Sequence, residues 1–187
     1  MIRKEEICKQ CGARCCKGPS PNITIFDVVR ILKYLNEKPE NVLKYFEVYT
    51  HEEYLCKILP ERFNVYISYE TINELKRRLG KYFENLLIIK LKKREDNSCI
   101  FLRDDDRCSI YPVRPMACRA YPLKITGLDD SCPMVKYDVD LSYERSMLDI
   151  YVREIEQHYR LFMSREISTV NQLIEVLLEY WSKVPIL

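Results

Sequence analysis

Histidine, glycine and tryptophan are scarce in this chain of 187 residues, which has two, four and one of them respectively. Neither His51 nor His158 lies near a cysteine cluster. A catalytic zinc site, which usually includes histidine ligands, is therefore disfavoured. The sequence also has no G-x-G-x-x-G pattern, so nothing in it indicates a bound dinucleotide.

Long apolar runs and a surplus of one charge are missing as well. No unbroken apolar stretch reaches about 18 residues, and the N-terminal segment MIRKEEICKQC has no apolar core of the signal-peptide type. The 30 Lys and Arg residues nearly balance the 28 Asp and Glu residues, which disfavours a nucleic-acid partner. We expect a soluble cytoplasmic protein that uses neither a membrane nor a nucleic acid.

Cysteine, in contrast, is abundant, with nine residues. A reducing cytosol keeps thiols free for metals or catalysis, so disulfides are the minority interpretation. That alternative stays open, because 31% charged residues and few glycines are typical of hyperthermophile proteins, which do form cytosolic disulfides. Apart from Cys56, the cysteines fall into a first group and a second group: Cys8, Cys11, Cys15 and Cys16, then Cys99, Cys108, Cys118 and Cys132.

The spacing within the first group indicates metal binding. Cys8 and Cys11 are separated by two residues, so one loop can direct both sulfurs at a single metal. Cys15 and Cys16 are adjacent and cannot easily both bind one tetrahedral ion. The pair indicates two metal sites, or one site plus a reactive thiol.

Eight thiolates complete two four-cysteine shells, and such soft ligands favour zinc, an iron–sulfur cluster or copper(I). Simple burial of the cysteines as small apolar residues is the alternative. Each four-thiolate cage carries a net charge of about −2. Five cations lie beside the cysteines in sequence and either offset that charge or bind an anionic substrate: Arg14, Lys17, Arg107, Arg114 and Arg119.

Hydrophobic patterning predicts an α+β fold for one domain spanning 1–187, with a cysteine-cluster region at 8–132 and a helical part at 139–187. The first twenty residues are expected to form a metal-binding loop that is not helical. Two early helices should follow, from Thr24 and from Pro39, and a further helix should span about 72–83. The remaining predicted elements are a three-stranded antiparallel meander over 86–92, 99–102 and 108–111, and two closing amphipathic helices, the second capped by Ser168.

Two segments carry a resemblance to a known family. CKQCGARCC and SCIFLRDDDRCSIYPVRPMACRAYP resemble the YkgJ-type cysteine-cluster proteins, the zinc- or iron-chelating CxxCxxCC proteins, over residues 8–132. The resemblance implies metal ligands at all eight positions of the two groups, and it leaves open which of Cys15 and Cys16 is the inner ligand. The family includes the cysteine-rich part of flagellin lysine methylases.

Three functions remain open at this stage. The first is a redox or radical-type enzyme, or its accessory, with a [4Fe-4S]-like cluster. The second is a module in which structural zinc organises a surface for a protein partner. The third is a hydrolase or transferase with catalytic zinc, against which the missing histidines argue. Whether the protein is an enzyme, its oligomeric state and the role of Cys56 are left undecided.

The sequence also predicts how the site is assembled. Members of the first group should lie within reach of the second, because neither group forms a closed shell. Arg114-Pro115 should lead into a turn or helix start whose free N–H groups favour an anionic sulfur at Cys118. Arg114 and Arg119 are the candidate residues for binding a cofactor.

Overall fold

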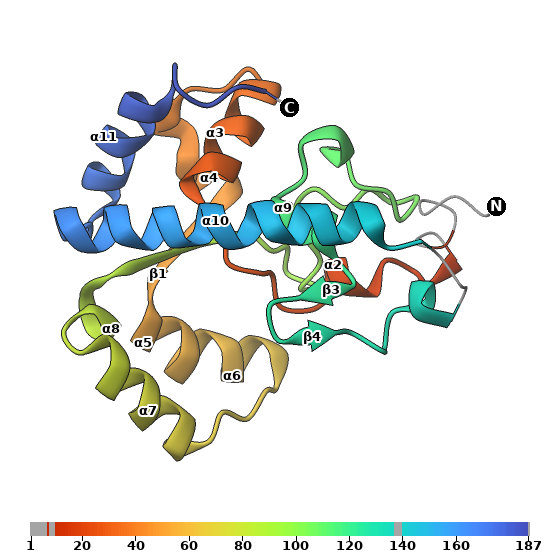
Figure 1. Ribbon diagram of the computed structural model, residues 1–187, viewed down its shortest axis with the longest axis horizontal. Helices are drawn as coiled ribbons and strands as arrows, with labels where there is room; N and C mark the ends of the chain where they lie inside the picture. Colours follow the sequence, from red (N-terminus) through yellow and green to blue (C-terminus); the bar gives the residue numbers. More distant parts are fainter. Residues whose placement is uncertain (1–6, 8–9, 137–139, 187) are drawn as a thin grey trace.

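The protein combines helices with two small antiparallel sheets in a computed structural model that describes residues 7, 10–136 and 140–186 (Figure 1). The expected α+β class is confirmed. The α-helices are α2 (Arg14–Lys17), α3 (Ile25–Tyr34), α4 (Val42–Tyr45), α5 (His51–Glu53), α6 (Leu59–Phe63), α7 (Tyr69–Leu79), α8 (Tyr82–Asn85), α9 (Met116–Ala120), α10 (Ser142–Arg165) and α11 (Val170–Tyr180). The strands and short turns of other helix types are β1 (Phe46–Thr50), β2 (Leu87–Leu91), β3 (Leu123–Lys124), β4 (Gly127–Leu128), η1 (Pro39–Asn41), η2 (Tyr54–Ile58), η3 (Tyr111–Val113) and η4 (Pro133–Lys136).

Helix α10 extends across the molecule, with α3, α4 and α11 above it and α5 to α8 below it in the view of Figure 1. Helix α3 begins as predicted. The Thr24 hydroxyl and the Asp27 carboxylate form a reciprocal capping box, and the apolar face that follows is buried. The two closing helices are confirmed, although Thr169 rather than Ser168 caps α11.

The predicted meander is wrong. Strand β2 forms where expected, but it pairs with β1, from Phe46 opposite Leu91 to Thr50 opposite Leu87. Because every residue of β2 is buried, its backbone groups need a full-length partner, and the segment from Phe46 supplies one.

The segments around Cys99 and Cys108 are too short to supply such a partner. Tight turns at Asn97 and Asp106, both with positive φ, reverse the chain just before Cys99 and Cys108 respectively. Cys99 and Cys108 therefore make only isolated bridges, to Lys93 and Leu102 respectively.

Two helix predictions also need correction. Residues 14–17, expected in a loop, form α2, which the chain enters through Ala13 in the left-handed region at φ 50°. The helix expected over about 72–83 is divided into α7 and α8, because Gly80 has a positive φ of 53° and ends α7. Within the part of the chain that the structure describes, no helix is long and apolar enough to cross a membrane.

His158 on α10 is buried in the core and gives a testable pH dependence. Its Nδ1 accepts a hydrogen bond from the Ile25 N–H at 3.4 Å. Burial, followed by the nearby His51, lowers the pKa of His158 from 6.5 to about 3. The unfolded chain therefore binds a proton that the folded chain excludes, and stability should fall as the pH drops below 6.5 towards 3. Between pH 7 and pH 5 we expect this residue to contribute a loss of about 2 kcal/mol in the free energy of unfolding.

Urea unfolding of the wild type and of His158→Asn at the two pH values measures this contribution. The asparagine carbonyl can replace the acceptor for Ile25 but does not titrate in this range. An unchanged pH slope in the variant would show that His158 is not its source.

Candidate metal centre

Among the residues that the structure describes, four cysteines from three separate segments line one cavity, here called the thiol cavity. They are Cys11 before α2, Cys15 in α2, Cys118 in α9 and Cys132 just before η4. The cavity volume is about 60 Å³, enough for a metal ion and a few waters but well below that of an ordinary small-molecule pocket. Its lining residues are Ile7, Cys11, Arg14, Cys15, Arg114, Cys118, Tyr121, Ser131, Cys132, Pro133 and Met134.

The remaining cysteines of the two groups lie beside the main core. Cys16 and Cys108 are partly buried against it, and Cys99 is part of it. The Cys99 N–H donates to the Cys16 carbonyl at 2.8 Å, which joins the first group directly to the second. Cys8 lies outside the described residues, and Cys56 is exposed in η2 and does not line the thiol cavity.

The thiols lie close enough to affect each other electrostatically. Loss of hydration raises the pKa of Cys118 well above its ordinary value, and neighbouring Cys99, Cys15 and Cys108 raise it further. Burial likewise raises the pKa of Cys108 to about 11. Such thiols stay protonated at neutral pH unless a cation is added, and a divalent metal is the kind of charge that reverses this preference. Among the residues that the structure describes, no group of three or more His, Cys, Asp or Glu side chains is already arranged to hold a metal ion.

A family model matches residues 7–133, about two thirds of the chain, and its description is "Putative zinc- or iron-chelating domain". The chain belongs to the CxxCxxCC family. All nine cysteines fall within the matched range, so family membership supports metal binding by this part of the chain. Neither the curated proteins nor the solved structures gave a significant match.

Lys93, just after β2, was not predicted to take part in the site. It supports the segment that carries Cys16. Its ammonium donates to the carbonyls of Cys16 at 3.0 Å and Gly18 at 2.6 Å. Burial lowers the pKa of Lys93, whereas the nearby thiols, Cys99 and Cys16 foremost, favour its charge. No local pattern distinguishes Lys93 from the other lysines of the run LIIKLKKR, so its role follows only from the fold.

The two candidate arginines differ in their surroundings. Arg114 lines the thiol cavity, and its guanidinium carbon lies 4.1 Å from the centroid of the Tyr111 ring. Arg119 does not line the cavity. Its guanidinium donates to the Arg114 carbonyl at 3.0 Å and also to the Pro112 carbonyl, so it braces the turn that precedes α9.

Substitution of each arginine by glutamine should distinguish a role in metal binding from a role in folding stability. We expect Arg114→Gln to weaken zinc binding by about threefold to tenfold, or roughly 0.6–1.4 kcal/mol, because a cation beside the thiolates is lost. Arg119→Gln should instead lower the free energy of unfolding by about 1–2 kcal/mol with little change in zinc affinity. Chelator competition and urea unfolding measure the two effects, and the reverse pattern would exchange the two roles.

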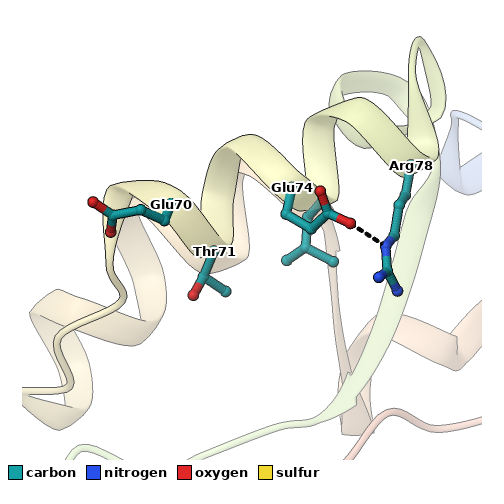
Figure 2. Close-up of a pocket in the computed structure, with 5 residues that line it drawn as sticks. Glu70, Thr71, Glu74 and Arg78 are labelled. Atoms are coloured by element: carbon teal, nitrogen blue, oxygen red, sulfur yellow. Dashed lines mark hydrogen bonds and ion pairs between the residues drawn. The ribbon is translucent and has the colours of Figure 1, made fainter.

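A wider hollow of about 390 Å³ lies along α7 and is lined by Glu70, Thr71, Glu74, Leu75 and Arg78. Figure 2 shows these side chains along one helix, with Glu74 directed at Arg78. That ion pair, at 2.6 Å, joins exposed groups and contributes little. The hollow contains no thiol, and its larger volume does not make it the site of metal chemistry.

Proposed function

We propose that the chain binds zinc or iron in a thiolate centre at the thiol cavity, with Cys11, Cys15, Cys118 and Cys132 as ligands. One observation carries this proposal: four thiols from three segments that are far apart in sequence line a single ion-sized cavity. The donor set fits, because sulfur ligands without histidine favour zinc or an iron–sulfur cluster over hard cations. Arg14 and Arg114 at the cavity wall can offset the negative charge of such a cage.

Cys8 is proposed as a further ligand from its spacing to Cys11. Of the adjacent pair, Cys15 is proposed as the cavity ligand, because Cys15 lines the cavity whereas Cys16 packs against the core. Cys16, Cys99 and Cys108 are then candidate ligands of a second centre. The Cys99–Cys16 hydrogen bond holds two of these candidates together, and because Cys16 is adjacent to Cys15 in the chain, the two proposed centres would be neighbours.

Two finer functions fit this site. The crowding of cysteines and cations supports an iron–sulfur cluster in a redox or radical-type enzyme or its accessory, where the cluster would supply electron transfer. A structural zinc that organises a surface for a protein partner is the alternative. It is supported by the position of Cys99, Cys108 and Cys132 outside the α-helices and named strands, where metal would hold short turns together.

Anaerobic purification followed by metal and sulfide quantification tests the proposal. We expect at least one equivalent of zinc or iron per chain, and Cys56→Ser should retain it, because Cys56 is exposed and does not line the cavity. Iron with sulfide and absorbance near 400 nm would identify the cluster, and zinc without sulfide the structural site. A protein that contains neither metal and binds neither on reconstitution would refute the proposal.

A further inference from the structure

Asp27 connects the core to the short helix that bears Cys118. This aspartate lies in the first turn of α3 and is fully buried. Its Oδ1 accepts a hydrogen bond at 3.0 Å from the backbone N–H of Met116, the first residue of α9. Cys118 follows two residues later. An acidic side chain 89 residues away in sequence thus holds the start of the cysteine-bearing helix.

The Met116 N–H needs such a partner. The first N–H groups of a helix have no acceptor within it, and Met116 is only 1% exposed, so water does not replace one. The preceding residue, Pro115, has no side-chain group that could cap α9. A buried donor without an acceptor is costly, and this N–H therefore favours the one backbone position of α9 at which Asp27 can accept its hydrogen bond.

Asp27 is itself held rigidly. Arg30 donates to its Oδ1 at 2.7 Å, and the N–H and hydroxyl of Thr24 lie 3.3 and 3.1 Å from its Oδ2. Arg30 is also bound by Glu154 of α10, with contacts of 2.7 and 2.6 Å. The acceptor offered to Met116 is thus fixed from α3 and, through Arg30, from α10.

We infer that Asp27 is a positioning residue for the metal centre, because it fixes the start of α9 and thereby the place of the Cys118 sulfur at the thiol cavity. This inference rests on the proposed function. A ligand that is held in place before the metal arrives loses less freedom on binding. Groups that orient a metal ligand from outside the ligand shell typically contribute 10- to 100-fold in metal affinity.

Removal of the single N–H group gives the sharpest test. Met116→Pro deletes the donor and leaves Asp27 with its other partners, and proline is well tolerated at the first position of a helix. Pro115 already has the extended ψ of 149° that a following proline requires. Met116→Ala is the matched control, because it also truncates the side chain but keeps the N–H.

Zinc affinity is measured by competition with a chromophoric chelator, and the absorption spectrum of bound Co²⁺ reports the ligand geometry. We expect Met116→Pro to bind zinc 10- to 100-fold more weakly than Met116→Ala and to show an altered Co²⁺ spectrum. Equal affinities and spectra in the two variants would overturn the role of Asp27. If the wild type binds neither ion, the proposed function fails, and the inference fails with it.

A second pair of variants keeps the test decisive if Met116→Pro does not fold. Asp27→Ala removes the acceptor for Met116, and Glu154→Gln weakens the same ion network without touching Met116. Both should lower thermal stability, but only Asp27→Ala should bind zinc 10- to 100-fold more weakly, whereas Glu154→Gln should stay within about threefold of the wild type. Wild-type affinity in Asp27→Ala would overturn the role of Asp27. A tenfold loss in Glu154→Gln would show that general loosening, not the bond to Met116, controls affinity.

Discussion

Cys118→Ser is expected to weaken metal binding at the thiol cavity by at least a hundredfold, the largest effect of any single substitution considered. Cys118 lines the cavity with members of the first group and is also an electrostatic neighbour of Cys99 and Cys108. Loss of the Cys118 sulfur therefore affects candidate ligands in both cysteine groups. A serine hydroxyl is a harder donor and stays protonated in a poorly hydrated site, so it does not replace a thiolate.

Metal content after anaerobic purification and zinc affinity by chelator competition measure the effect. Cys118→Ala separates lost ligation from the burial of a new hydroxyl, and we expect both variants to lose the metal. Cys56→Ser, at an exposed cysteine, is the matched control. Full metal occupancy and unchanged stability in Cys118→Ser would remove Cys118 from the ligand set.

The parts of the fold that were predicted from sequence depend on local interactions. A reciprocal capping box at Thr24 and an apolar period of 3.6 residues identify α3, and the same periodicity identifies the two closing helices. The Arg114-Pro115 pair was predicted to lead into a turn or helix start, and α9 begins directly after it, at Met116. Each of these signals lies within a few residues of the element that it specifies.

The predictions that failed depend on partners distant in the chain. β2 is a strand by its own composition, but nothing local specifies that its partner is the segment from Phe46 and not the one from Cys99. The two tight turns at Asn97 and Asp106 reverse the chain before a ladder can form, although their sequences also fit hairpin loops.

In the candidate site, too, some residues could be predicted from the sequence, and others follow only from the tertiary fold. The cysteine count and the family resemblance gave the eight ligand candidates, whereas the two residues that support them were missed as such. Asp27 belongs to the capping box of α3, and Lys93 is one lysine in a basic run. Their bonds to Met116 and to the Cys16 carbonyl span 89 and 77 residues, so they follow from the tertiary fold alone. That the chain forms a single domain stays a prediction.

Metal removal is expected to destabilise the protein without unfolding its core. Metal at a free concentration a thousand times its Kd stabilises the folded state by about 4 kcal/mol, or roughly 8–16 °C in Tm for a chain of this size. Chelation should therefore lower Tm by that amount. The main core, formed around α3, β2, α10 and α11, does not depend on the thiol cavity, so the helical circular dichroism signal at 25 °C should persist.

The local effect of chelation should be confined to the first cysteine group. Cys11 and Cys15 lie at the cavity, and the nearby ion pair between Lys17 and Asp106 is exposed and contributes little. Without metal, the segment around α2 should open more often, and trypsin should cleave after Arg14 and Lys17 at least tenfold faster. Cleavage after Lys57, in η2 and outside the thiol cavity, is the internal control and should keep its rate. Mass spectrometry of timed digests follows the three sites together. Equal acceleration at Lys57 would mean that the metal stabilises the whole chain evenly, and an unchanged Tm with unchanged cleavage would mean that no metal joins the two cysteine groups.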